Sequence, residues 1–168
     1  MNGLMAILEI CDWLQETPLS YYLRESESVF AYLSITHMVG LTLAGGSIAY
    51  LDLRLVGFGL RRSPVSKVAA SLLPCMWIGF VMLAVSGALI VISEPVFLYG
   101  SWLFRAKMLM MVLAGVNALV FHYTVFRRVG EWDLAPTVPL QARVTGAISL
   151  TLWMGMIAAG RAIPYYTT

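Results

Sequence analysis

Residues 68–93, VAASLLPCMWIGFVMLAVSGALIVIS, decide the fold. These 26 residues contain no Asp, Glu, Lys or Arg. At 1.5 Å per residue, a helix of this length reaches about 39 Å, more than the ~30 Å hydrocarbon core of a bilayer. Lipid offers the backbone no hydrogen-bonding partner, so a segment that crosses it must be helical. The stretch therefore predicts a membrane-spanning helix.

Three further gaps between charged residues have the same character. They predict spans at about 28–51, 102–126 and 144–163, the last two lengthened by flanking side chains that snorkel. Across the chain 60% of residues are hydrophobic and 12% are charged, and the mean hydropathy is +0.80. So few charged groups could not cover the surface of a soluble domain of 168 residues. The predicted fold class is all-α integral membrane, a four-transmembrane-helix bundle formed by residues 18–168.

The segment 1–17 predicts an N-terminal amphipathic interfacial helix. One helical face carries Leu4, Leu8, Cys11 and Leu14, and another carries Glu9, Asp12 and Glu16. Such a helix lies on the outer membrane surface or docks on a partner subunit, and Pro18 ends it. It does not resemble a signal peptide, because acids interrupt its apolar run and it lacks a basic start.

Composition also excludes several classes of function. A net charge of +2 gives no basic surface for nucleic acid. The two cysteines, Cys11 and Cys75, lie in separate segments and read as unpaired thiols. No hydrolytic triad, phosphate-binding loop or carboxylate pair is present.

The loops predict the orientation. Seven basic residues lie in the loops 52–67 and 127–143, against four at the opposite side, which also carries six of the nine acids. The positive-inside rule then places both termini outside the cytoplasm. We expect a protein of the bacterial inner membrane with periplasmic termini. Asp52 and Arg54 are interpreted as a pair at the inner boundary of the first span.

Both histidines of the chain, His37 and His122, fall inside predicted spans. Ionisable groups within a bilayer are costly and are candidates for function. The alternative is a neutral imidazole that only hydrogen-bonds across the bundle. Because the only two histidines are both intramembrane, we favour function, with neutral imidazole as an axial ligand of haem iron.

Each histidine shares a helical face with small residues. Gly40 and Ala44 accompany His37, and Gly115 and Ala118 accompany His122. Such a groove admits a flat ring such as a porphyrin. Close helix packing through small residues is the alternative and needs no ligand.

The two histidines differ in predicted height by roughly 7 Å, which counts against a haem held by both. Met108 and Met111 lie nearer the height of His37 and are alternative ligands, either of haem iron or of Cu(I). Methionine is also an ordinary filler of apolar gaps. Arg105 and Lys107 open the third span and are candidates to pair with haem propionates, or else interface anchors.

Four short motifs carry a resemblance to known families. They are Ile35-Thr36-His37, Tyr50-Leu51-Asp52-Leu53-Arg54, Ala106-Lys107-Met108-Leu109 and Phe121-His122-Tyr123. In this order the chain, over about residues 30–127, resembles the HemJ-type protoporphyrinogen oxidases and, more loosely, the membrane domain of CopD-type copper-resistance proteins. The resemblance implies a four-helix bundle with haem b, His37 as its best ligand candidate, and functional weight for Arg54 and Lys107. Residues 55–67 lack the further histidine of the HemJ-type pattern.

Three functional hypotheses follow. The first is a haem b protein of electron transfer in the lipid bilayer, with a quinone or a partner membrane or periplasmic subunit. The second is a copper-handling membrane protein. The third is a non-catalytic subunit of a larger complex, in which the histidines are structural. An oligomer is compatible with each.

Overall fold

The computed structural model describes residues 2–58, 63–133, 135 and 137–166. These residues are almost entirely helical, and no strand occurs among them. Four helical segments are long and apolar enough to cross a membrane: Glu27–Val56, Val65–Ser93, Trp102–Trp132 and Leu140–Tyr165. The predicted all-α integral membrane fold, a four-helix bundle preceded by a short N-terminal helix, is confirmed.

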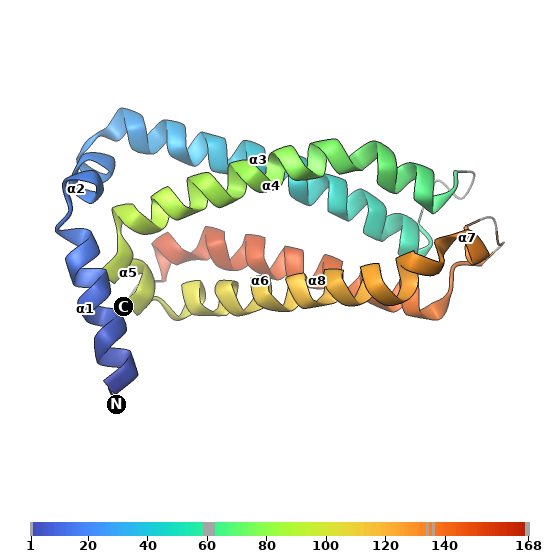
Figure 1. The fold of residues 1–168 in the computed structure, drawn as a ribbon. Helices are drawn as coiled ribbons and strands as arrows, with labels where there is room; N and C mark the ends of the chain where they lie inside the picture. The colour runs from blue at the N-terminus through green and yellow to red at the C-terminus, as the bar shows by residue number, and fades with distance from the viewer. Residues whose placement is uncertain (1, 59–62, 134, 136, 167–168) are drawn as a thin grey trace.

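The four long helices run alternately up and down the bundle (Figure 1). They are α3 (Glu27–Val56), α4 (Val65–Ser93), α6 (Trp102–Val120) and α8 (Leu140–Ala162). Helix α3 packs along both α4 and α8, and α8 also packs along α6. In the described part of the chain, α4 and α6 have no comparable packing against each other. The bundle therefore consists of two helix pairs, α3–α4 and α6–α8, joined through α3 and α8.

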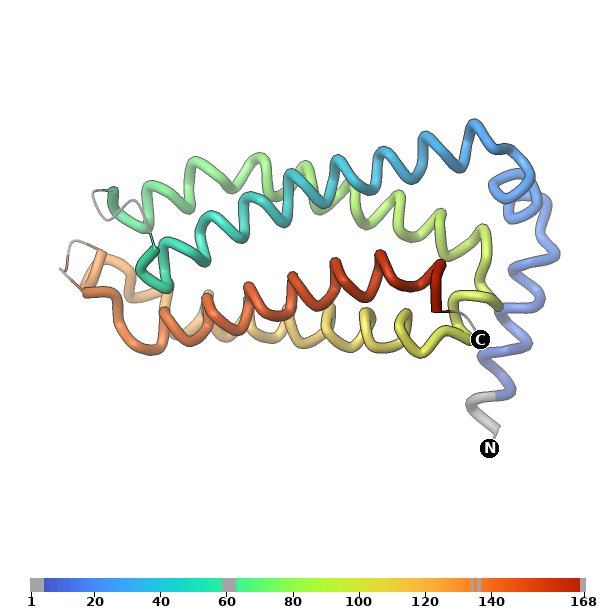
Figure 2. The backbone as a smooth tube through the Cα atoms, turned by 180° about the vertical axis from the view of Figure 1, so that it is seen from behind, coloured from blue at the N-terminus to red at the C-terminus, as the bar shows by residue number. Residues whose placement is uncertain are grey.

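Short elements close the two ends of the bundle. The N-terminal end carries α1 (Asn2–Gln15), α2 (Pro18–Glu25), α5 (Pro95–Gly100) and the turn of 3-10 helix Ile163–Tyr165 that follows α8. The opposite end carries the π-helix Phe121–Val125, the 3-10 turn Phe126–Arg128 and α7 (Val129–Trp132), which continue α6. Figure 2 shows the same arrangement from behind, with α1 and the end of α8 at one end of the bundle.

The starts and ends of the helices coincide with capping residues in the sequence. Thr17 caps α2, accepting a hydrogen bond from the Ser20 N–H, and Pro18 occupies the first turn, where its missing N–H costs nothing. Pro18 therefore begins a helix that the sequence interpretation missed, rather than only ending α1. Gly57 ends α3 with φ 106°, a left-handed conformation that favours glycine.

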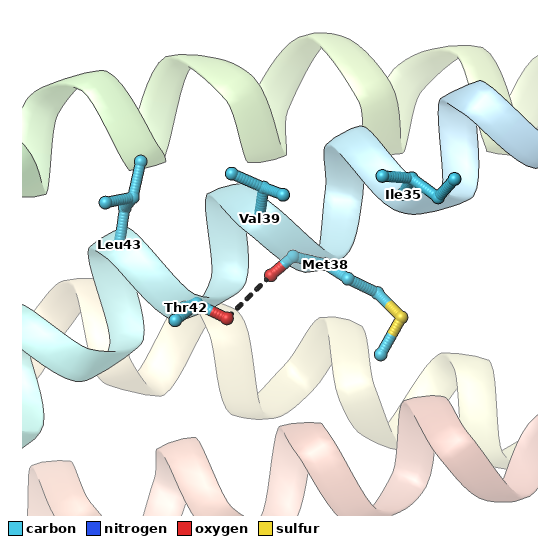
Figure 3. A pocket seen from close by; sticks show the side chains of 5 residues that line it. All are labelled: Ile35, Met38, Val39, Thr42 and Leu43. Carbon is cyan, nitrogen blue, oxygen red and sulfur yellow. Dashed lines mark hydrogen bonds between the residues drawn. The ribbon is translucent and has the colours of Figure 1, made fainter.

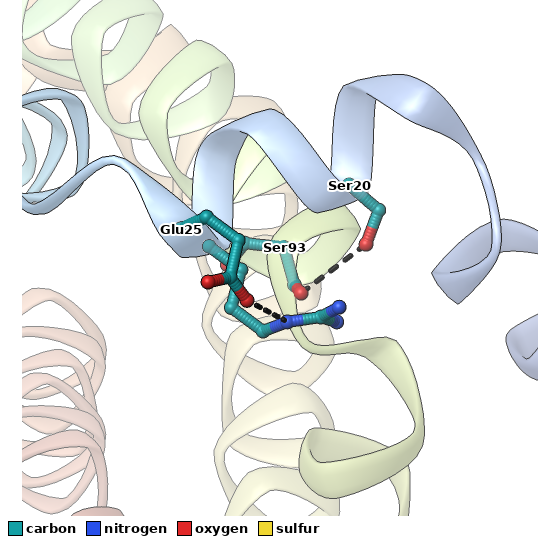
Figure 4. Close-up of polar contacts among 4 residues, drawn as sticks. Ser20, Glu25 and Ser93 are labelled. Atoms are coloured by element: carbon teal, nitrogen blue, oxygen red, sulfur yellow. Dashed lines mark hydrogen bonds and ion pairs between the residues drawn. The ribbon is translucent and has the colours of Figure 1, made fainter.

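Helix α1 lies across the N-terminal end of the bundle, roughly perpendicular to the long helices (Figure 1). It packs on α5, and Cys11 and Leu14 are half-buried, whereas Ile10 and Trp13 are exposed. The side chain of Leu4 lies outside the described residues. Helix α2 is fastened to the end of α4, because the Ser20 hydroxyl donates a hydrogen bond to the Ser93 carbonyl, 3.3 Å away (Figure 4).

Two apolar clusters hold the bundle. One lies at the end away from the termini and contains Leu55, Val65, Val125 and Ala142. The other lies at the terminal end and contains Leu98, Leu103, Ala159 and Ile163. Most other large apolar side chains of the long helices are exposed, as expected where lipid replaces water around the bundle.

Candidate functional site

His37 lies on α3, half-buried, and its ring packs against α4. Its Nδ1 atom is 2.9 Å from the hydroxyl oxygen of Ser86, a residue that is only 1% exposed. The next residue on α4 is Gly87, and a Cβ atom there would lie 3.3 Å from Cε1 of His37. A serine and a glycine of α4 therefore provide both the partner and the space for this ring.

The hydrogen bonds of Ser86 determine which nitrogen of His37 carries hydrogen. The Ser86 hydroxyl has a single hydrogen, which it donates to the Met82 carbonyl within α4. With that hydrogen donated within α4, the Ser86 oxygen accepts from His37, which corresponds to the tautomer with hydrogen on Nδ1. In the neutral ring Nε2 keeps its lone pair, free to bind a metal or accept a hydrogen bond.

Lys107 supplies a positive charge inside the same half of the bundle. Its side chain leans toward α8, where a Cβ atom on Gly160 would lie 3.3 Å from Nζ. The ammonium is close enough to His37 to interact with it electrostatically. In the described residues the one ion pair joins Arg24 and Glu25, so Lys107 has no acidic partner there.

The small residues beside His37 form a helix contact. A Cβ atom on Gly40 would lie 2.9 Å from Cβ of Met82 and 3.0 Å from the Gly79 carbonyl oxygen. A Cβ atom on Gly79 would lie 2.4 Å from the backbone nitrogen of Ala44. Helix α4 thus fills the groove at Gly40 and Ala44 that was predicted to admit a porphyrin. These residues serve close helix packing instead.

The predicted groove on the third span faces outward. Gly115, Ala118 and His122 are all exposed, and nothing lies within 4 Å of a Cβ built on Gly115. His122 belongs to the π-helix, and its ring stacks on Phe126 at 6.0 Å between centroids. The structure therefore does not bring His122 into the interior with His37.

Height separates the two histidines further. His37 is ten residues from the start of α3, and His122 is twenty residues from the start of α6. Both helices begin at the same end of the bundle (Figure 1). At 1.5 Å per residue the two positions differ by about 15 Å along the bundle.

The remaining ligand candidates are exposed. Met108 and Met111 are 39% and 48% exposed, and Arg105 is also exposed. In the described part of the chain no group of three or more His, Cys, Asp or Glu side chains is placed to hold a metal ion. Of the two basic residues predicted at the start of the third span, only Lys107 turns inward.

A hollow of about 320 Å³ lies along the outer side of α3 (Figure 3). Its lining comes from one helix, and no ionisable residue takes part: Ile35, Met38, Val39, Thr42 and Leu43. The Thr42 hydroxyl donates to the Met38 carbonyl of its own helix, 3.0 Å away, and so offers little to a polar ligand. The hollow suits an apolar chain of the surrounding lipid.

Asp52 and Arg54 differ from the predicted boundary pair. Helix α3 continues to Val56, and both residues are buried, with 6% and 7% of their surfaces exposed. No ion pair joins them in the described residues. The charge-gap argument ended the first span too early, because it treated the first charged residue as the edge of the membrane.

Ser86 is the residue of this site that the sequence interpretation missed. One signal was available: Ser86 is a polar residue in the longest uncharged stretch, followed by a glycine. The sequence alone does not show which residue of which neighbouring helix reaches His37, because that depends on how far each helix is rotated in the bundle.

Comparison with known proteins identifies the protein family of this chain. The model of a "Family of unknown function (DUF6644)" matches residues 10–166. No curated protein and no solved structure matches the chain. The match covers all four long helices and the C-terminal part of α1. The chain therefore belongs to the DUF6644 family.

Proposed function

We propose that this protein binds haem b through His37 and transfers electrons within the membrane. The observation that carries the proposal is the hydrogen bond between Nδ1 of His37 and Ser86, which leaves the lone pair of Nε2 available for a metal. A histidine that binds a metal usually holds its other ring nitrogen in such a bond, which fixes the ring orientation. The resemblance to HemJ-type proteins supports the same residue.

Lys107 adds the charge that such a cofactor needs. A haem brings two negatively charged propionates, and Lys107 is an inward cation without an acidic partner among the described residues. Since α4 fills the groove at Gly40 and Ala44, the cofactor would lie on the side of His37 that faces Lys107. The donor set therefore fits a haem with one histidine ligand from this chain.

The haem would supply one-electron chemistry, and the protein residues would hold and tune it. Ser86 would fix the His37 ring, and Lys107 would neutralise a propionate. We propose a membrane quinone or a partner subunit as the electron-transfer partner. The copper hypothesis has less support, because its ligand candidates Met108 and Met111 are exposed.

We also propose the bacterial inner membrane as the location, with the termini in the periplasm. The end of the bundle opposite α1 carries Lys67, Arg127, Arg128 and Arg143, as the positive-inside rule requires of the cytoplasmic side. Arg61 and Arg62 belong to the same argument but lie outside the described residues. Alkaline phosphatase fused after Thr168 should be active, and phosphatase inserted in the loop 57–64 should be inactive.

Absorption spectroscopy tests the cofactor. The full chain, purified in mild detergent after expression with added haem, should show a Soret band that sharpens on reduction, and a b-type pyridine haemochrome. His37→Ala should lose the haem. His122→Ala is the matched control, because its ring lies on the outer surface, and it should keep the haem.

Two results would overturn the haem proposal. One is a folded wild-type protein without haem after haem supply. The other is retention of haem with unchanged spectra in His37→Ala. A colourless protein that still assembles with other membrane proteins would favour the non-catalytic subunit instead.

A further inference from the structure

Asp52 is a buried carboxyl group inside a membrane-spanning helix. It lies one turn before the end of α3 and is 6% exposed. Helix α8 passes close to it: a Cβ atom on Gly146 would lie 3.2 Å from the backbone oxygen of Asp52. Ser149, also on α8, lies near the Asp52 carboxyl group. The group is thus enclosed between α3 and α8.

The second oxygen of this carboxyl group has no partner. Oδ2 of Asp52 is buried and accepts no hydrogen bond. The nearest cation in the sequence, Arg54, is two residues further along the helix and so points to another side. Its Nη2 donates to the Ser63 carbonyl at 3.1 Å, and its Nε is itself buried without a partner. Arg54 therefore does not neutralise Asp52.

Other charged residues at this end are turned outward or occupied. Arg143 on α8 and Lys67 on α4 are exposed. Asp133, which follows α7, accepts hydrogen bonds from the N–H and hydroxyl of Ser66 at the start of α4. Arg127, Arg128 and Glu131, on the elements that continue α6, are also exposed. Arg61 and Arg62 lie outside the described residues.

We propose that Asp52 is an intramembrane proton-binding site whose occupancy is linked to the packing of α8 on α3. Among the described residues no cation pairs with this carboxyl group, and Oδ2 has no hydrogen bond, so burying the ionised carboxylate here is far more costly than burying the neutral acid. The carboxyl group therefore carries a proton while α8 is packed. When Oδ2 loses that proton, α8 draws back from Asp52 so that water reaches the carboxylate.

This site is separate from the proposed haem site. It lies toward the end of the bundle opposite the termini, fifteen residues along α3 from His37. Intramembrane acids that face the interior of a bundle are the usual stations of proton pathways. The chemistry assigned to Asp52 is therefore uptake of a proton from the cytoplasmic side and its release, with no bond formed other than O–H.

Infrared spectroscopy tests protonation directly. The full chain in lipid nanodiscs at neutral pH should show the carbonyl band of a protonated carboxylic acid. The band should be absent in Asp52→Asn and moved in Ser149→Ala. Asp133→Asn is the control, because Asp133 already accepts two hydrogen bonds, and it should leave the band in place.

Isotope labelling secures the assignment if Asp52→Asn does not fold. The chain has only three aspartates, Asp12, Asp52 and Asp133, so a carboxyl ¹³C label on aspartate should shift the band. The proposal is overturned if the wild type shows no such band at neutral pH. It is also overturned if the band persists in Asp52→Asn or does not move with the label.

Hydrogen exchange tests the link to α8. As the pH is raised until the carboxylic acid band disappears, amide exchange near Gly146 and Ser149 should accelerate. In Asp52→Asn, which stays neutral, this acceleration should be lost. An equal acceleration in wild type and variant would show that α8 does not respond to this proton.

Discussion

Nδ1 of His37 on α3 lies 2.9 Å from the hydroxyl oxygen of Ser86 on α4. This hydrogen bond joins two helices whose backbones already touch at Gly40 and Gly79. Between such helices the orientation of a histidine ring is set by its neighbours, because the close packing leaves little room for rotation. The pair therefore fastens α3 to α4 and fixes the orientation of the His37 ring.

Ser86→Ala should destabilise the bundle by about 1 kcal/mol, because the variant leaves the His37 N–H without its acceptor. Thermal unfolding in detergent measures this as a lower melting temperature. Thr36→Ala is the control: its hydroxyl is exposed and bonds only to the Tyr32 carbonyl of its own helix. Equal melting temperatures for Ser86→Ala and Thr36→Ala would contradict the role given to Ser86.

Lys107→Gln should weaken haem retention, if the cofactor is present, because the charge opposite a propionate is lost. Losing a charged hydrogen bond worth about 1.5 kcal/mol or more weakens the affinity for haem roughly tenfold or more. Haem titration of the apoprotein measures the change. Arg105→Gln, at an exposed position two residues earlier, should bind haem like the wild type. Equal losses of haem affinity in both variants would show that the inward position of Lys107 does not contribute specifically to haem binding.

The existence of the spans could be predicted from the sequence, but their ends could not. The second span begins at Val65 rather than 68, and α8 begins at Leu140 rather than 144. Helix α3 continues through Asp52 and Arg54, because neighbouring helices and the Ser63 carbonyl surround these charges. Gaps between charged residues locate the segments that must cross lipid. Whether a charged residue can be buried within a helix depends on partners that are distant in sequence.

The candidate site could be predicted only in part, since helix rotation is not a local property. That Gly40, Ala44 and His37 share a face follows from helical periodicity. That α4 fills this face, while the corresponding face around His122 meets the outside, depends on packing. Lipid is as apolar as the bundle interior, so hydrophobicity does not distinguish the inner from the outer face of such a helix.

Gly79→Ala should destabilise the bundle by about 1–3 kcal/mol, the range for overpacking a close contact. The added Cβ would lie 2.4 Å from the Ala44 nitrogen and 2.8 Å from the Gly40 carbonyl oxygen, and backbone atoms cannot rotate away. Gly115→Ala is the matched control, because its Cβ would meet nothing within 4 Å. It should be neutral or slightly stabilising. Thermal unfolding compares the two, and a Gly79→Ala variant as stable as Gly115→Ala would contradict the close crossing of α3 and α4.

Helix α1 should lie in the plane of the membrane surface, because it runs across the end of the bundle and its apolar side chain Ile10 is 60% exposed (Figure 1). Spin labels test this in a Cys11→Ser, Cys75→Ser background reconstituted in lipid. A label on Ile10→Cys should relax more with oxygen, which concentrates in lipid. A label on Asp12→Cys, on the opposite side of the helix, should relax more with a water-soluble nickel complex. Equal access of the nickel complex to both positions would place α1 in water, and its exposed apolar residues Ile10 and Trp13 would then need a protein partner rather than lipid.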